Sequence, residues 1–361
     1  MLHQGFNNRY ILGISFVSAL GGYLFGFDFA VISGALPFLR KAFQLSPVGE
    51  GFLTGSLALG CIAGCLLAAK LADRFGRKPG LMIAAFIFMV SSLGMAFSAA
   101  LDIFLCMRFL AGIGVGMASM LSPMYIAEVS PAAIRGRNVA INQLTIVMGI
   151  LITNLINYML ADKGSESWRW MFGLGAVPSS LFFAFVFWLP ESPRWLVKVN
   201  RLQEAEKILL KIGSRQFCET TMSHISSSLK GAGKQSYKAV FSKGMRPAVL
   251  VGIALAVFQQ LCGINIVFNY TSTIFASVGA DLNKQLFETV AIGLVNLVFT
   301  FFAMWKVDKW GRRPLMLMGS LALSVLYIFL AISLWEKWSP GFVSLFVLLA
   351  IAAYATSLAP V

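Results

Sequence analysis

Ten apolar stretches, each about 20 residues long, constrain this chain more than any other feature of its sequence. A helix of about 20 apolar residues is long enough to cross the hydrocarbon core of a bilayer. Only helices and closed barrels satisfy their backbone hydrogen bonds in lipid, so these stretches predict an all-α polytopic membrane protein. The stretches occupy residues 10–32, 48–69, 81–100, 103–126, 138–160, 170–189, 247–277, 286–305, 315–334 and 342–361.

The distribution of charge supports this interpretation and predicts an orientation. Charged residues make up 12% of the chain, about half of the roughly 25% found in soluble domains. The net charge of +14 does not indicate a nucleic-acid partner, because the basic residues cluster between the apolar stretches. Most of them fall on the side that carries Arg9 and the segment 190–246, so we expect a cytoplasmic N-terminus. The short outer loop between the first two stretches favours a bacterial inner (cell) membrane.

The residues that most often build metal or catalytic sites are scarce. The chain has two histidines and five cysteines, and none of the cysteines forms a CxxC pair. No nucleophile–base pair or ligand cluster is visible in this pattern. We therefore expect no metal, no cofactor and no enzymatic activity.

One long polar segment divides the chain into two halves. Residues 1–189 form a predicted six-helix bundle, and residues 247–361 form a second, incomplete one. Between them, Ser192 and Pro193 are typical of a helix start, and Leu202, Ala205 and Leu209 recur at helical spacing. Residues 190–246 are therefore predicted to form amphipathic cytoplasmic helices, followed by a flexible linker at "SSSLKGAGKQS" from Ser226.

The same loop motif occurs once in each half. "ADRFGRKPGLM" (72–82) follows the second stretch, and "VDKWGRRPLML" (307–317) follows the eighth. Both read Asp, basic, aromatic, Gly, basic, basic, Pro. A repeat at equivalent topological positions is typical of secondary transporters.

These motifs, with "MRFLAGIGVG", "SPMYIAEVSPAAIRGRN", "LPESPRWL" and "FQQLCGIN", resemble the sugar porter family of the major facilitator superfamily over the whole chain. The resemblance implies two six-helix bundles that alternate access around a central sugar. Ten of the family's twelve membrane helices would be present, because the sequence ends at "ATSLAPV" in the tenth stretch. We therefore expect residues 1–361 alone not to catalyse coupled transport.

Two charges lie within the apolar stretches: Asp28 in the first and Arg108 in the fourth. A charge at this depth is costly, so we expect the two to pair, with snorkelling of Asp28 to the interface as the alternative. A carboxylate that is neutral or ionised in different conformations can couple a proton to transport. By resemblance, proton-coupled symporters carry Asp at this position and facilitators carry Asn.

Amide side chains cluster in the seventh stretch. Gln259, Gln260 and Asn265 cannot all face one cavity on a straight helix, but Gly263 between them permits a bend. Amides donate and accept hydrogen bonds, as vicinal sugar hydroxyls require; the alternative is hydrogen bonding between helices. The resemblance implies that these three bind the sugar together with Gln143, Asn296 and Phe25.

Two further groups take their expected roles from the resemblance. Tyr270 belongs to an outer gate, whereas Asn269 replaces a tyrosine of the family pattern. A network of charges at the cytoplasmic ends of the helices is expected to latch the two bundles in the outward-open state. Its members are Asp73, Arg77, Glu128, Arg135, Arg137, Glu191, Arg194, Asp308 and Arg312.

The sequence thus predicts a monomeric, proton-coupled monosaccharide symporter. Ile150 stands where some pentose carriers have Gln, which favours a hexose. The alternatives are a facilitative sugar uniporter and a truncated membrane protein that binds sugar without transporting it.

Overall fold

The computed structural model of the chain describes residues 6–231 and 244–359, with the backbone alone at 230, 231, 306–310 and 312. Every regular element in these ranges is a helix. Ten helical spans are long and apolar enough to cross a membrane, which confirms the prediction of ten.

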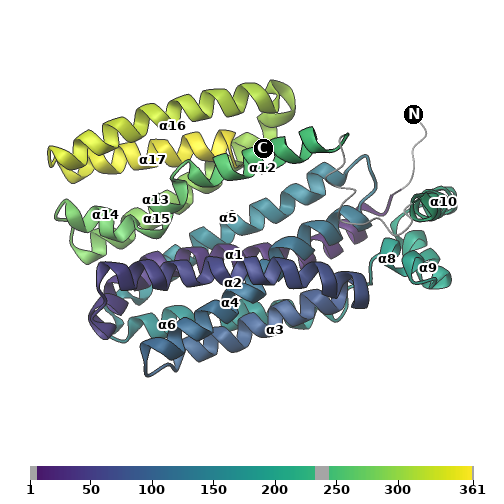
Figure 1. Cartoon of the computed structure of the whole chain (residues 1–361), viewed down its shortest axis with the longest axis horizontal. Helices are drawn as coiled ribbons and strands as arrows, with labels where there is room; N and C mark the ends of the chain where they lie inside the picture. The colour runs from purple at the N-terminus through teal and green to yellow at the C-terminus, as the bar shows by residue number, and fades with distance from the viewer. Residues whose placement is uncertain (1–5, 232–243, 360–361) are drawn as a thin grey trace.

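The first six spans form one bundle. Its main helices, coloured purple to teal in Figure 1, pack side by side along the long axis of the molecule. Their bounds are α1 (Asn8–Phe43), α2 (Pro47–Phe75), α3 (Arg77–Ala96), α4 (Leu101–Val129), α5 (Arg135–Leu160), α6 (Ser167–Gly173) and α7 (Ala176–Val186), with a 3₁₀ turn at Ala161–Lys163.

Close helix contacts hold this bundle together. A Cβ atom on Gly112 of α4 would lie 2.3 Å from the carbonyl oxygen of Leu57 on α2, so glycine lets the two backbones approach. Phe88, Phe104 and Trp168 are buried in the core of the bundle. Phe52 and Leu66 of α2 are exposed, as expected for side chains that face lipid.

Three short helices form an insert between the two halves: α8 (Pro193–Lys198), α9 (Leu202–Ile212) and α10 (Arg215–Gly231). Ser192 caps α8 as predicted, with its hydroxyl accepting from the Trp195 amide. The insert lies at one end of the bundle, on the right in Figure 1. We call this the insert end and the opposite end the distal end.

The prediction of a linker from Ser226 was wrong for its first part. Residues 226–231 continue α10, and the rest of the motif, residues 232–236, lies outside the described residues. Ile225 and Leu229 stand four positions apart on α10 and pack against the buried cluster of Trp195 and Leu196. This apolar burial outweighs the weak helix propensity of the serines.

The second half contains α12 (Arg246–Leu261), α13 (Ile264–Asn269), α14 (Thr271–Ser277), α15 (Leu282–Trp310), α16 (Arg312–Trp335) and α17 (Pro340–Ser357). In Figure 1, α16 and α17 form the layer farthest from α3, and α15 packs against both α5 and α17. The two halves therefore meet along α5 and α15 and along α1, α13 and α14.

Three spans differ from single straight helices with the bounds of the apolar stretches. Helix α1 continues through Pro37 to Phe43 and includes Arg40, so it is longer than the apolar stretch. The sixth span is broken between α6 and α7. The seventh is broken at Gly263, whose φ of 81° lies in the left-handed region, and again at Tyr270. The expected bend at Gly263 is therefore present.

Candidate functional site

Asp28 and Arg108 lie together in the middle of the first bundle. Nη1 of Arg108 is 3.5 Å from Oδ1 of Asp28, and each side chain is 1% exposed. This burial inside the bundle is evidence against the alternative that Asp28 snorkels to the interface. Each charge offsets the cost of burying the other.

The Arg108 guanidinium makes two further contacts. Its Nε donates to the carbonyl oxygen of Leu53 on α2 at 3.1 Å, and its central carbon lies 5.6 Å from the ring centre of Phe172. Asp28 is less fully bonded, since its Oδ2 is buried without a hydrogen-bond partner among the described residues. This oxygen is a place where a proton can be held.

The break at Gly263 separates the amides that the sequence placed together. Nδ2 of Asn265, after the break, donates back to Oε1 of Gln260 at 2.7 Å. Gln259 points elsewhere, with its Nε2 donating to the carbonyl oxygen of Leu358 beyond α17. Gln260 and Asn265 therefore form one polar unit, while Gln259 joins α12 to the end of the last described helix.

The other expected sugar-binding residues come from three different helices. Phe25 on α1 stacks on Phe29 at 6.0 Å between ring centres, and Phe29 meets Phe268 of α13 at 5.7 Å. Gln143 on α5 is half-buried, and Asn296 on α15 is buried. Aromatic rings thus connect α1 to the broken seventh span.

Three hydrogen-bonded contacts at the distal end join the two halves, and Asn154 of α5 adds a further bond between them by donating to the Thr289 carbonyl oxygen of α15 at 2.7 Å. The Tyr270 hydroxyl lies 2.8 Å from Oγ1 of Thr54 on α2, and Ser272 donates to the carbonyl oxygen of Ser33 on α1. In the third, Nη2 of Arg40 donates both to Glu50 at 2.8 Å and to Thr273 at 3.4 Å. Asn269 is half-buried beside this set.

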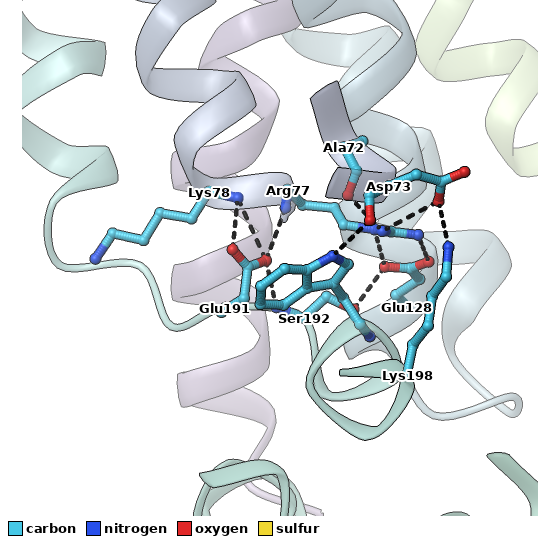
Figure 2. Close-up of polar contacts among 9 residues, drawn as sticks. Ala72, Asp73, Arg77, Lys78, Glu128, Glu191, Ser192 and Lys198 are labelled. Carbon is cyan, nitrogen blue, oxygen red and sulfur yellow. Dashed lines mark hydrogen bonds and ion pairs between the residues drawn. The ribbon is translucent and has the colours of Figure 1, made fainter. Parts of the chain in front are cut away.

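At the insert end, charged groups gather around Arg77 and Glu191, as Figure 2 shows. Arg77 makes a two-pronged bond to Glu128, with both nitrogen–oxygen distances 2.8 Å. Lys198 of α8 reaches Asp73 at 2.9 Å. Ser192 donates to Glu128, so the insert is attached to α4 as well as to α2.

Glu191 holds the loop motif in place through backbone amides. Its carboxylate accepts from the amides of Arg77, Lys78 and Ser192. Burial raises the pKa of Glu191 above its ordinary value, and the three amides and the charge of Arg77 oppose that rise. The Gly76 that precedes Arg77 has a φ of 102°, a conformation that favours glycine.

The predicted latch between the bundles stays a prediction, because the side chains of its two members in the second half, Asp308 and Arg312, lie outside the described residues. Every described ion pair of this network lies within the first bundle and the insert. Arg135, Arg137 and Arg194 are exposed and make no ion pair with a described residue. Among the described residues, the contacts of the distal end join the two halves.

Sequence reasoning missed several residues at these sites. No sequence motif includes Thr54, Glu50 or Ser272, so these residues are identified only by their contacts in the structure. Arg40 and Glu50 flank a short connection between two helices, which could have signalled a pair. The Tyr327 hydroxyl of α16 is buried without a partner among the described residues, and its ring lies next to the break at Gly263.

Comparison with known proteins shows extensive similarity to sugar carriers. Residues 14–361 match the family described as "Sugar (and other) transporter". The D-xylose-proton symporter of Escherichia coli (strain K12) is 37% identical, over 100% of this chain and 79% of the symporter. The arabinose-proton symporter of Bacillus subtilis (strain 168) is 36% identical, over 98% of this chain and 77% of its own. A glucose transport protein of Synechocystis is 39% identical, with coverages of 88% and 71%.

Solved structures give the same result for the fold. The partially occluded inward-open conformation of the xylose transporter XylE from E. coli superposes with a TM-score of 0.88 at 34% identity, covering 97% of this chain and 85% of the transporter. XylE bound to 6-bromo-6-deoxy-D-glucose superposes with a TM-score of 0.86 at 35% identity, covering 98% and 81%. The ten spans are ten of the twelve membrane helices of the major facilitator fold. The chain therefore belongs to the sugar porter family of the major facilitator superfamily.

Proposed function

We propose that this protein, with the full twelve helices of its family, is a secondary transporter that imports a monosaccharide together with a proton; for residues 1–361 alone we expect sugar and proton binding without coupled transport. Members of its family are transporters and not enzymes. The observation that carries the proposal is the Asp28–Arg108 pair, buried between membrane-spanning helices, with one carboxylate oxygen that has no hydrogen-bond partner among the described residues. Arg108 stays charged at any physiological pH, so Asp28 is the member of the pair that exchanges the proton.

The relatives support sugar as the substrate. Their names include carriers of D-xylose, arabinose, galactose and glucose. Gln260 and Asn265 offer both donors and acceptors beside the break in the seventh span, which suits sugar hydroxyls. Our proposal of a hexose rests on the apolar Ile150 of α5, which packs against Ile264 and Val267 of α13.

We further propose that transport proceeds by alternating access and that this conformation faces the insert end. Hydrogen bonds that join the two halves at the distal end support this assignment. Similarity to an inward-open relative supports this assignment. In this proposal the insert end and the N-terminus are cytoplasmic and the membrane is the cell membrane.

Sugar-linked proton uptake tests the function. The purified chain, in detergent with a pH-sensitive dye and little buffer, is mixed with D-glucose, D-xylose or L-glucose as the control. We expect the D-hexose to bind most tightly and to make the solution more alkaline. Binding without proton uptake would identify a uniporter, and tighter binding of D-xylose would overturn the hexose assignment. The absence of binding for every sugar tested would contradict the function itself.

A further inference from the structure

A short chain of contacts runs from the buried ion pair to the contacts of the distal end. Arg108 is bonded at the same time to Asp28 on α1 and to the Leu53 carbonyl on α2. The next residue of α2, Thr54, carries the hydroxyl that meets Tyr270. Two helices of the first bundle and the break in the seventh span are therefore linked through one turn of α2.

The hydroxyl of Thr54 has acceptors on its own helix. It lies 2.9 Å from the Glu50 carbonyl and 3.1 Å from the Gly51 carbonyl, and both of these groups can only accept. Thr54 has a single hydrogen to donate, so whenever it donates to one of these carbonyls the tyrosine hydroxyl is the donor in the contact with Tyr270. Thr54 is then held by its own helix and receives the bond from the other half.

Protonation of Asp28 alters the hydrogen bonding of this turn of α2. While Asp28 is ionised, the guanidinium is held between the carboxylate and the Leu53 carbonyl. Protonation removes one of these two attractions, and the charge that remains must be compensated by its neutral acceptors. Among the described residues, two charged or titratable side chains face Asp28: Arg108 on α4 and Cys61 on α2.

We propose that Thr54 is a positioning residue that transmits the protonation of Asp28, through Arg108 and the Leu53 carbonyl, to Tyr270 and the closure of the distal end. The inference rests on the proposed function, because it assumes that Asp28 exchanges the proton. It goes beyond that function by naming Thr54 and a second path between the halves. In this path, the protonation of Asp28 on α1 affects the second half through α2 and not only through α1 itself.

A competing route exists within the same structure. Ser272 bonds to the Ser33 carbonyl of α1, five residues beyond Asp28 on the same helix. A movement of α1 could reach the second half by this contact without Thr54. Contiguous contacts alone do not demonstrate coupling, so the two routes must be separated by experiment.

The test measures the distance across the distal end by double electron–electron resonance. Spin labels are placed at Val48 of α2 and Ala276 of α14, which are both exposed, after replacement of the five native cysteines. Asp28→Asn fixes the neutral form with little change of shape. We expect this substitution to shift the distance distribution when Thr54 is present, and the shift to be lost in Thr54→Val.

Two controls make the result specific. Ser272→Ala breaks the competing contact and should change the starting distribution while the response to Asp28→Asn persists. Thr220→Val removes an exposed hydroxyl that bonds only within α10, and it should have no effect. Tyr270→Phe should mimic Thr54→Val, and the two together should have no more effect than either alone.

The outcomes distinguish this inference from the function on which it rests. Loss of the shift in Ser272→Ala but not in Thr54→Val would assign the route to α1 and overturn the proposal. A distribution that does not respond to Asp28→Asn would overturn it as well. Sugar-linked proton uptake, measured on the same preparation, tests the symport function separately, because its loss does not depend on which helix carries the signal.

Discussion

Arg108 Nη1 lies 3.5 Å from Asp28 Oδ1, in a bundle where both side chains are almost completely removed from the surface. A buried pair of this kind stabilises a fold weakly, because desolvation of the two charges offsets most of their attraction. Removal of either side chain, however, leaves the charge of the other buried without compensation. The proposed proton exchange and the integrity of the bundle therefore depend on the same pair of side chains.

The first prediction concerns the proton. Asp28→Asn keeps the shape of the side chain but removes the group that titrates. We expect sugar binding to remain and the proton uptake that accompanies it to disappear, as read by a pH-sensitive dye in weak buffer. Persistence of proton uptake in this variant would show that Asp28 is only a structural partner of Arg108.

The second prediction concerns the pair as a unit. Arg108→Met leaves the Asp28 carboxylate buried without its partner, which should lower the free energy of unfolding by about 3–5 kcal/mol. The double variant Asp28→Asn/Arg108→Met contains no buried charge at this site and should recover most of that loss. Denaturant unfolding in mixed micelles measures both. A double variant as unstable as the single one would refute charge burial as the cause.

The third prediction concerns the amides of the seventh span. Gln260→Ala removes one member of the Gln260–Asn265 unit and leaves polar groups unpaired, so sugar binding should weaken by about 1–3 kcal/mol. Asn265→Ala should add little to this effect, because the two side chains share a hydrogen bond. Isothermal titration measures the affinities. Unchanged affinity for the sugar in Gln260→Ala would mean that this amide serves only in hydrogen bonds within the protein.

The fourth prediction is a pH dependence at the insert end. Burial raises the pKa of Glu191, so the folded chain retains this proton to a higher pH than the unfolded chain. Between the ordinary and the raised pKa the folded state binds more protons, and its stability therefore falls as pH rises. Glu191→Gln should flatten this decline in a plot of melting temperature against pH. Glu219→Gln, in an exposed pair of α10, is the control and should follow the unmodified chain.

The fifth prediction concerns orientation. Ser165 follows the fifth span and Ser214 lies between α9 and α10, and both are exposed. Single cysteines at these positions, in a chain without its native cysteines, should react with a membrane-impermeant maleimide from opposite sides of the membrane. Position 214 should be labelled only after the cells are opened. Labelling of both positions from one side would contradict the topology.

The sequence by itself determined the features that depend on local chemistry. Apolar length determines which segments enter the membrane, and the repeated loop motif with "PESPRWL" identifies the family. The glycine at position 263 marks a break because few other residues adopt its φ. The pairing of Asp28 with Arg108 was also predictable, since two opposite charges within apolar stretches have few other ways to offset their burial.

The tertiary structure alone decided which groups meet across the chain. Thr54 and Tyr270 are 216 residues apart and belong to no shared pattern, so only the packing of α2 against the broken seventh span brings their hydroxyls together. Gln259 and Gln260 are adjacent in sequence, yet they bond in different directions because the break at Gly263 returns Asn265 to only one of them. The contacts that join the halves change when a transporter changes conformation, whereas composition and periodicity stay the same in every state. The sequence therefore specifies the bundle and its buried charges, and the tertiary structure decides which groups of the two halves are in contact.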